Sequence, residues 1–561
     1  MSGLSLVPAI FYNVKLYSAV GDGSVDFNAA ITSTTTALSS TTSPGPFTSG
    51  MVGKKILVTG AGASGVNLWS SITAFTDSQH VTINDAASTS VSGATIYILS
   101  TDDMTAIKNT MAATTLTGGV LYLPPGIYYA VIPQDAVGAQ VTKYPVRVVG
   151  AGQGATVLVA DGASLSATTC LFTAAAGTIL TIEDLTTVGP AVPNSQATNM
   201  VRHFGTSGKL TVRRVTSTGF TQPIQIDNGA TCQATLDECT LANSGQTLAS
   251  AVASIGDIQR FRAYDTQVTG YGLAASNQSH AMYIHQGVDT AIAHCSFSGN
   301  RGIGFSIHSF NGSGTSPNFS VDDCYFASDS YQGILSNPTV RSRITNCRFL
   351  GVQRAVTLQF DAEINGCEFD GITAGNNYIS QLTGTSKVNI RHCWFNTPAV
   401  TGTAPLNNNA AGNIWRVIGC SFACNQAQAL NNSGPGTYAM LNCDFADDGV
   451  GHLILAATGT PTLSAINANV TNTVVVAGSN DIRGKITFDL QTGTIAAGSA
   501  LFTVNFATTY GATPYVLVGH DDNQTTSLFY VTQESTTIFI VRNSATLPNT
   551  TGFKMFYMVM G

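Results

Sequence analysis

The stretch VDTAIAHCSFSG, residues 288–299, contains the unit that decides the fold. Its Cys-x-Phe centre occurs seven times in the chain, and successive copies are 20 to 29 residues apart. The seven cysteines are Cys295, Cys324, Cys347, Cys367, Cys393, Cys420 and Cys443. Weaker copies with similar spacing precede them, at Leu185, Val215, Cys239 and Thr266. A fixed period in this range indicates a solenoid.

The residues around each cysteine predict how one coil of this solenoid turns. An apolar residue stands three positions before each cysteine, as Ile292 does before Cys295. Alternate side chains of a strand point to opposite faces, so both can face inward only if the chain bends between them. The residue directly before each cysteine is of a type that tolerates the left-handed backbone region. These residues are His294, Asp323, Asn346, Gly366, His392, Gly419 and Asn442. We therefore predict a strand, a corner with a left-handed residue, and a second strand.

Such corners, stacked about 4.8 Å apart, build a right-handed parallel β-helix. The fold class that we predict is all-β, with cysteines and phenylalanines in separate internal stacks and the residue between them outside. Metal binding is the alternative for the cysteines. Zinc sites need closely spaced pairs such as C-x-x-C, and the sequence has none. We therefore interpret the cysteines as small packed hydrophobes and expect no metal and no cofactor.

Composition agrees with a strand-rich chain. Only 10% of the 561 residues are charged, against about a quarter in typical soluble domains. Long helices need charged residues on their exposed faces, whereas strands accept the abundant Thr and Ser. The net charge of −7 argues against nucleic acid as a partner. The chain has no apolar run long enough to span a membrane, so we expect no membrane insertion.

The segment KKILVTGAGASGVNLW, residues 54–69, matches the spacing of a dinucleotide-binding turn. Gly60, Gly62 and Gly65 are followed twenty residues later by Asp85. Such a turn must open a helix whose N-terminus holds the pyrophosphate. Residues 66–93 are instead rich in Ser, Thr and β-branched types and show no helical stripe. We interpret the glycines as a tight β-turn inside a small β-module.

Four N-terminal segments carry a family resemblance. They are AVGDGSVDFNAAI (19–31), TDDMTAIKNTM (101–111), GGVLYLPPGIYY (118–129) and VRVVGAGQGATVLV (146–159). Together they resemble the opening of the pectate-lyase-like β-helix family that includes phage tailspikes. In that family the Asp-Asp helix follows the Gly-Asp-Gly turn directly, whereas about 60 residues intervene here. We expect a segment 1–45 with the turn and a short helix, an inserted β-module 46–100, a β-helix 101–475 and a C-terminal β-sandwich 476–561.

The resemblance implies a function as well as a fold. It implies a homotrimeric phage tailspike on the virion tail, attached through another tail or baseplate protein. Such a protein binds a bacterial surface polysaccharide (capsule, exopolysaccharide or O-antigen) and depolymerises it as a glycoside hydrolase or a polysaccharide lyase. The N-terminal MSGLSLVPAI has no signal-peptide character, which is typical of a protein made in the host cytoplasm. The alternatives are a non-catalytic receptor-binding fibre and a stand-alone pectate-lyase-like enzyme.

Two groups of outward residues are candidate catalytic sites. Asp361 and Glu363 share one strand face about 7 Å apart, a separation that suits an inverting glycosidase. Arg341 and Arg343 lie one coil before them and Lys387 one coil after, so an interstrand ion-pair ladder explains the same residues. Arg343 is also a candidate substrate-binding residue.

The second group comes from SHAMYIHQG and GIGFSIHSF. If Met282 and Ile284 face inward, Tyr283 and His285 face outward, and aligned coils place His308 next to His285. Histidine and tyrosine suit proton transfer in a lyase, and they also suit a neutral hydrogen-bonding surface. His280 and Arg301 are the substrate-binding candidates of this group.

Exposed aromatic rings are the remaining candidates, because rings stack on the faces of sugars. Tyr325 and Trp394 each occupy the middle of a Cys-x-Phe unit and are therefore predicted to face solvent. Arg348 and Glu368 occupy the same position on the two intervening coils and are predicted to pair with each other.

Overall fold

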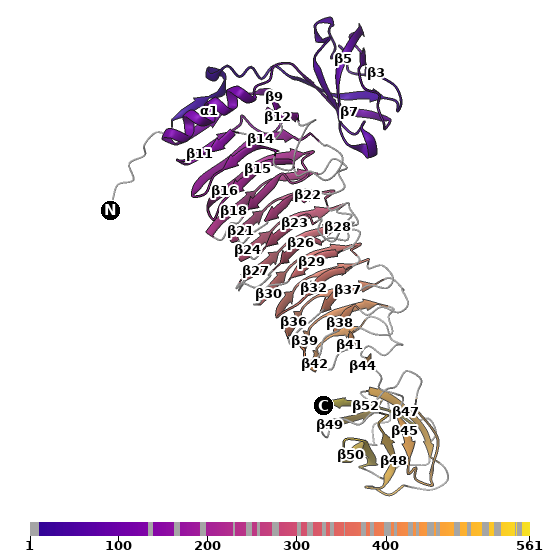
Figure 1. Ribbon diagram of the computed structural model, residues 1–561. Helices are drawn as coiled ribbons and strands as arrows, with labels where there is room; N and C mark the ends of the chain where they lie inside the picture. Colours follow the sequence, from indigo (N-terminus) through magenta and orange to yellow (C-terminus); the bar gives the residue numbers. More distant parts are fainter. Residues whose placement is uncertain are drawn as a thin grey trace, which may run out of the picture. The chain divides into compact units, whose positions relative to one another are not determined.

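The computed structural model confirms an all-β chain with a parallel β-helix (Figure 1). A 25-stranded sheet and a 13-stranded sheet are formed by strands that pair in parallel from one coil to the next. The structure describes residues 10–132, 139–161, 169–190, 198–227, 231–242, 250–254, 258–271, 280–285, 287–299, 305–310, 318–327, 332–336, 341–352, 354–371, 377–381, 386–397, 405–408, 412–424, 430–432, 437–445, 454–455, 461–475, 483–490, 495–507, 515–520, 529–544, 546 and 553–560.

The corners turn as the repeat predicts. One of them joins β24 (Gly287–Ala293) to β25 (Ser296–Ser298) through His294 and Cys295. All seven predicted corner residues have a positive φ, between 47° and 64°. The residues before the four weaker copies, Asp184, Arg214, Glu238 and Asp265, have a φ between 47° and 60°. The left-handed corner therefore extends over both the strong and the weak repeats.

The internal stacks are also confirmed. Six phenylalanine rings on successive coils lie 4.7–5.0 Å apart, with interplanar angles of 1–8°. They are Phe297, Phe326, Phe349, Phe369, Phe395 and Phe422. The cysteines from Cys295 to Cys420 are at most 2% exposed, and Cys443 is partly exposed. Both residues of the Cys-x-Phe unit therefore build the core.

The two halves of the family motif meet although the insertion separates them. The Asp103 carboxylate accepts hydrogen bonds from the backbone N–H groups of Val20 (2.6 Å) and Gly21 (3.1 Å). Gly21 has φ 62°, and a Cβ there would lie 2.8 Å from the Tyr128 ring, so glycine is needed on both counts. Helix α1 (Met104–Thr117) starts directly after Asp103. The inserted module thus leaves and re-enters the fold at neighbouring points.

The inserted module is a closed antiparallel barrel, and it is larger than predicted. Its strands are β2 (Ser24–Ile31), β3 (Ala37–Ser40), β4 (Lys55–Val58), β5 (Leu68–Asp77), β6 (His80–Ile83) and β7 (Val91–Leu99). The predicted start at residue 46 is wrong, because residues 24–45 contribute two of the six strands. Within the described part of 1–45 the helical element is a short 3₁₀ helix, η1 (Val14–Tyr17). The barrel includes these earlier strands because the buried Asp26 carboxylate accepts hydrogen bonds from the hydroxyls of Ser40, the last residue of β3, and of Thr42, two residues later.

The glycine motif lies in the turn between β4 and β5, which pair in antiparallel fashion. Residues Ala63–Gly65 form a three-residue 3₁₀ turn, and β5 follows it instead of an α-helix. The interpretation as a tight turn inside a β-module agrees with this geometry.

The barrel packs firmly against the first coils. Leu57 and Leu99 of the barrel share one apolar cluster with Ile127, Val159 and Val188 of the β-helix. Trp69 adds a hydrogen bond of 2.9 Å from its indole Nε1 to the carbonyl oxygen of Pro190. The barrel therefore belongs to the same compact unit as these coils.

The C-terminal region forms two four-stranded antiparallel sheets. One contains β45 (Thr462–Ser464), β48 (Ala500–Asn505), β51 (Ile538–Asn543) and β50 (Phe529–Glu534); the other contains β46 (Val470–Val475), β47 (Arg483–Leu490), β52 (Phe553–Met560) and β49 (Tyr515–His520). Both sheets contribute to one buried apolar cluster. The predicted β-helix boundary at 475 is wrong, because β45 and β46 pair with later antiparallel strands. A sandwich that caps the β-helix stays a prediction.

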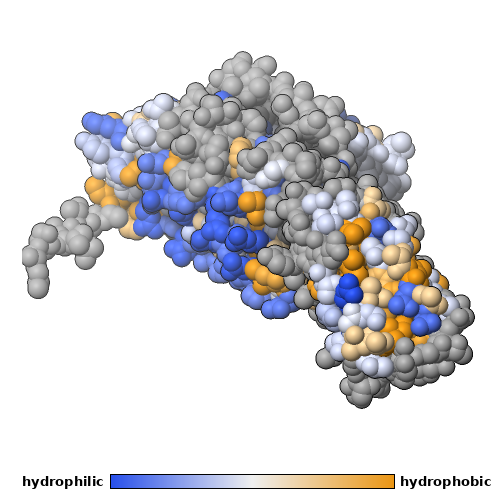
Figure 2. Space-filling model, turned by 90° about the horizontal axis from the view of Figure 1, so that it is seen from below, coloured by the Kyte–Doolittle hydropathy of each residue, from blue (hydrophilic) through white to orange (hydrophobic). Residues whose placement is uncertain are grey.

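The surface differs between these regions. Apolar side chains gather on one part of the surface, at the lower right of Figure 2. Val474 and Phe556 of the C-terminal sheets are exposed apolar residues. A broad stretch of the surface farther left is hydrophilic. Within the described part of the chain, no helix has the length and apolar character to cross a membrane.

Candidate functional site

The carboxylates of Asp361 and Glu363 both have structural partners. Asp361 precedes β33 (Ala362–Asn365), and its Oδ1 accepts a hydrogen bond of 2.7 Å from the backbone N–H of Lys387. Glu363 Oε2 lies 3.6 Å from Arg341 Nη2. Arg343 is exposed and in register with Glu363. These contacts favour the interstrand ladder over a catalytic pair.

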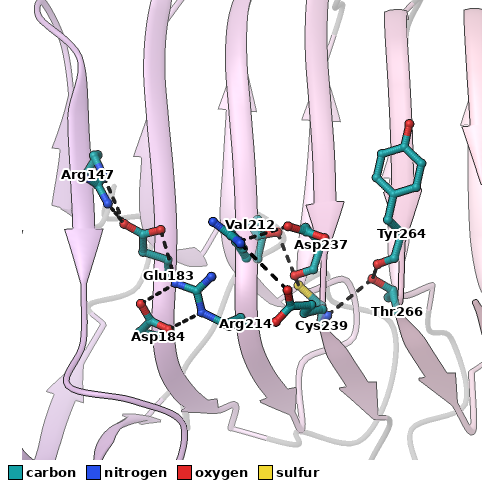
Figure 3. Close-up of polar contacts among 11 residues, drawn as sticks. Arg147, Glu183, Asp184, Val212, Arg214, Asp237, Cys239, Tyr264 and Thr266 are labelled. Atoms are coloured by element: carbon teal, nitrogen blue, oxygen red, sulfur yellow. Dashed lines mark hydrogen bonds and ion pairs between the residues drawn. The ribbon is translucent and has the colours of Figure 1, made fainter. Parts of the chain in front are cut away.

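Similar ladders occur on the earlier coils (Figure 3). Arg147 pairs with Glu183, and Arg214 binds Asp184 through Nε and Nη2 at 2.6 and 2.7 Å. The hydrogen bonds from Arg214 hold the pKa of Asp184 below its usual value, and the same bonds raise the pKa of Arg214. A polar hollow of about 400 Å³ lies at this corner, lined by Gln153, Asp184, Arg214, Glu238, Cys239, Thr240, Asp265 and Gln267. Sequence reasoning did not predict this hollow, although the corner residues form a column that the repeat reveals.

The second predicted group comes together as a cluster on the 13-stranded sheet. We call His280, Tyr283, His285 and His308 the histidine cluster. Strand β23 (Met282–His285) carries Tyr283 and His285, and β26 (Phe305–Phe310) carries His308. Met282 and Ile284 are fully buried, so their neighbours on β23 face outward as predicted. His280 stands at the turn before β23, where its backbone N–H donates to Ser250 Oγ at 3.3 Å.

Three of the four rings are in direct contact. His308 Nδ1 and His280 Nε2 are 2.8 Å apart and share a hydrogen bond, so one imidazole donates and the other accepts. The Tyr283 ring stacks on His280 with centroids 5.4 Å apart, and its centroid lies 5.2 Å from that of His308. The His285 ring is farther away, at 6.3 Å from Tyr283. The cluster is thus a hydrogen-bonded histidine pair packed against a tyrosine.

Burial keeps this pair neutral. Desolvation lowers the pKa of His280 to about 4, and desolvation together with His280 and His285 lowers the pKa of His308 to about 3. Burial also raises the pKa of Tyr283 above its usual value. At neutral pH the pair is therefore two neutral imidazoles beside a protonated phenol. His280 is only 2% exposed, whereas Tyr283 and His308 are partly exposed.

The register of the cluster differs from the prediction. His308 pairs with Tyr283 on the neighbouring strand, and His285 pairs with Phe310, so His308 does not stand next to His285. The coils differ in length between the corner and this sheet, because the cysteines are 20 to 29 residues apart. Counting residues back from the Cys-x-Phe corner therefore does not predict which residues pair between neighbouring strands of the 13-stranded sheet. Arg301, the other candidate of this group, lies outside the described residues.

Sequence reasoning missed a polar group two strands from Tyr283. Gln225 of β17 (Ile224–Asp227) pairs with Ala253 of β20 (Val252–Ser254), which pairs with Tyr283. The Arg202 Nε lies 2.6 Å from Asp227 Oδ2, and Gln225 donates to Asp227 Oδ1 at 2.9 Å. No repeated motif marks these residues, so the chain alone gave no signal for them.

The exposed aromatic residues lie where the repeat places them. Tyr325, Arg348, Glu368 and Trp394 are in register on four successive coils. Tyr325 and Trp394 are each 37% exposed, which confirms that both face solvent. The Arg348 Nε lies 3.0 Å from Glu368 Oε2, which confirms the predicted pair. Within the described ranges, no group of three His, Cys, Asp or Glu side chains is arranged to hold a metal ion.

No protein-family profile and no curated protein sequence matches the chain. Solved structures with a similar fold are phage tailspikes and β-helix proteins that act on polysaccharides. The Dettilon tailspike protein is 12% identical, with a TM-score of 0.45 over 82% of this chain and 91% of that one. The A-module of the Azotobacter vinelandii mannuronan C-5 epimerase AlgE6 is 15% identical, with a TM-score of 0.41 over 62% and 96%. The tailspike protein 3 of bacteriophage CBA120 is 14% identical, with a TM-score of 0.40 over 70% and 67%.

Proposed function

We propose that the protein is a tailspike of a phage virion, a homotrimer that binds a bacterial surface polysaccharide and cleaves it at the histidine cluster. The neutral, hydrogen-bonded pair of His280 and His308 beside Tyr283 carries this proposal. The N-terminal motif supports the tailspike part, since its Gly-Asp-Gly turn and Asp-Asp helix meet at the first coils. Another tail or baseplate protein would hold it on the virion.

The cluster suits β-elimination in a uronate-containing chain. A neutral imidazole has a lone pair that can accept a proton at neutral pH, although the low pKa of His308 makes it a weak base in the substrate-free protein. His308 would take the proton from the carbon beside the uronate carboxylate through Nε2, because Nδ1 is bonded to His280; Nε2 is buried in this structure, so the bound chain would have to uncover it. The C–O bond to the leaving sugar then breaks, a C=C bond forms, and the protonated Tyr283 phenol supplies a proton to the leaving oxygen. The buried His280 is a positioning residue that fixes the tautomer of His308.

The remaining sequence candidates have supporting roles in this proposal. Tyr325 and Trp394 would stack on sugar rings of the bound chain. His285, Arg343 and Arg301 stay proposed contacts of the polysaccharide. Asp361 and Glu363 would act as a hydrolytic pair only if their present partners were exchanged for substrate, so a glycoside hydrolase is the weaker assignment. A stand-alone polysaccharide lyase would use the same chemistry.

A non-catalytic receptor-binding fibre is the second candidate. The burial of His280, at 2% exposure, favours it, because a buried histidine pair also serves as a purely structural element of the sheet. The fibre would bind the same polysaccharide through the exposed aromatic residues and leave it intact.

The products of the reaction decide between these functions. We would incubate the protein with purified capsular polysaccharide, exopolysaccharide and lipopolysaccharide, and measure new reducing ends and the ultraviolet absorbance of unsaturated uronate. A lyase gives both signals, and Tyr283→Phe lowers their rate by about a hundredfold. A hydrolase gives reducing ends alone. Tight binding without any product establishes the fibre and excludes the enzyme.

A further inference from the structure

We propose a second binding site, for an anionic polysaccharide, on the outer face of the 25-stranded sheet. It consists of Lys387, Arg391, Arg416 and Trp394, which we call the cationic row. It lies on different strands from the histidine cluster and does not depend on the proposed catalysis, but it rests on the proposed polysaccharide binding, of which Trp394 is a contact.

The sheet places the three cations on one face of two adjacent coils, and Trp394 follows on the next strand, past the corner at His392. Lys387 and Arg391 are the ends of β36 (Lys387–Arg391), where the burial alternates so that both face solvent. Arg416 of β39 (Ile414–Ile418) pairs with Asn389, midway between them on β36. Trp394 opens β37 (Trp394–Thr397) directly after the corner at His392. The two ends of β36 are about 13 Å apart, so the row spans more than one sugar residue.

The cations of the row lack a direct ion-pair partner in the described part of the chain; Glu363, in register with Asn389 between Lys387 and Arg391, is paired with Arg341. On earlier coils, several exposed arginines pair with acids, as in Arg213 with Asp237 at 3.0 Å and Arg260 with Asp289 at 3.4 Å. Among the residues that the structure describes, no carboxylate forms an ion pair with the side chain of Lys387, Arg391 or Arg416. The nearby Asp361 is bonded to the backbone N–H of Lys387, and Glu368 is paired with Arg348.

A local cation excess is unexpected in a chain with a net charge of −7. Exposed charges on a β-helix are ordinarily stabilised by opposite charges on the next coil. Exposed cations without such partners are solvated by water, and a cluster of them attracts anions from outside the chain. Guanidinium groups bind carboxylate and sulfate oxygens in bidentate geometry. Trp394, which is 37% exposed, follows Arg391 by three residues and offers a ring face past the corner.

These features identify the occupant as a glycan that carries carboxylate or sulfate groups. The ring of Trp394 favours a sugar polymer over a simple anion, since a ring face contributes by contact with the apolar face of a sugar. The negative charge of the whole protein opposes nucleic acid, whose binding needs an extended basic surface. The cationic row would hold an acidic chain through alternating ionic and stacking contacts.

Binding to immobilised polymers tests this proposal. We would measure retention of the full chain at low salt on heparin, on polygalacturonate and on dextran as the neutral polymer. The wild-type protein is expected to bind both polyanions and not dextran, and to be released as salt rises. Arg391→Gln together with Arg416→Gln is expected to weaken binding to both polyanions by about tenfold or more.

Matched variants separate charge from folding. Arg213→Gln with Arg260→Gln removes the same charge from paired arginines elsewhere on the helix, and it should change binding by less than about twofold. Arg391→Lys with Arg416→Lys keeps the charge and should retain heparin binding. Trp394→Ala should weaken polygalacturonate binding more than heparin binding.

Several results would overturn the proposal. They are equal retention on dextran, no retention on either polyanion, or a loss of binding that is the same in the Arg213/Arg260 control as in the Arg391/Arg416 variant. None of these results bears on cleavage, because the proposed depolymerase is measured by products and by variants of the histidine cluster. A failure of binding at the cationic row is therefore distinguishable from a failure of cleavage at the histidine cluster.

Discussion

At the scale of the residue, Asn346 shows what a left-handed corner demands of a side chain. Its φ is 53°, in the middle of the β-helix. A β-branched residue in this conformation costs about 1–2 kcal/mol, because its Cβ crowds the following carbonyl. We expect Asn346→Val to destabilise the β-helix by that amount and Asn346→Gly to be nearly neutral. Thermal unfolding followed by circular dichroism measures the difference. Equal melting temperatures for the Val and Gly variants would contradict the role of the corner.

The buried histidines predict a loss of stability in mild acid. Burial lowers the pKa of His280 to about 4 and of His308 to about 3, from 6.5 in the unfolded chain. Below pH 6.5 these two histidines are therefore protonated in the unfolded chain while they stay neutral in the folded chain. Stability should be full above about pH 6.5 and should fall by a few kcal/mol as the pH drops toward 4. His203, whose pKa burial also lowers, adds in the same direction.

A comparison of variants shows whether the buried histidines cause this loss of stability in acid. Denaturation midpoints would be measured between pH 7 and 4.5, where the carboxylates remain largely ionised. His280→Gln with His308→Gln should flatten the curve, whereas Gln at the exposed His392 should leave its slope unchanged. A slope that persists in the double variant would show that other groups cause it.

The sequence predicted the positions of individual side chains correctly where those residues belong to a repeated unit. The corner residues, the buried cysteines and the pair of Arg348 with Glu368 follow from the Cys-x-Phe period, because every coil repeats the same geometry at that point. The partner of His308 did not follow, since coils of unequal length shift the register on the 13-stranded sheet. The ion pair of Arg202 with Asp227 lies outside any repeated motif, so the sequence could not predict it.

At the scale of the element, the phenylalanine stack should behave as one structure. Phe349 lies 4.7 Å from Phe326 and 5.0 Å from Phe369, and all three rings are fully buried. Phe349→Ala would leave a cavity that interrupts the stack, at a cost of about 3–5 kcal/mol. Phe349→Leu should cost clearly less. Urea unfolding of the two variants measures this, and an Ala variant as stable as the Leu variant would argue against a continuous stack.

The elements also show where local pattern was insufficient. The sequence VDFNAAI resembles a family segment that leads into a helix, but here it forms β2 of the barrel. The deciding contacts are long-range, between Asp26 and the hydroxyls of Ser40 and Thr42. The same holds for β45 and β46. Their sequences predict strands correctly, but the sequence does not show that these strands pair in antiparallel fashion with later strands instead of in parallel with the preceding coil.

At the scale of the whole molecule, the tailspike proposal predicts a trimer. Light scattering of the purified protein should give a mass three times that of the 58.2 kDa chain. The apolar side chains exposed on the C-terminal sheets, among them Val474 and Phe556, would be covered in that assembly. Val474→Lys with Phe556→Lys should lower the mass toward one chain, and Arg213→Gln is a surface control. A wild-type monomer would contradict the tailspike assignment.

The cleavage rate of a bacterial polysaccharide by matched site variants tests the central claim most directly. The substrate would be the purified capsule of a bacterium to which the protein adsorbs, and unsaturated reducing ends would be counted over time. The account predicts that His308→Gln reduces the rate by about a hundredfold or more while binding persists. Asp361→Asn should leave the rate within about twofold, because its carboxylate is bound to the backbone of Lys387. Loss of cleavage in Asp361→Asn with full activity in His308→Gln would contradict the account.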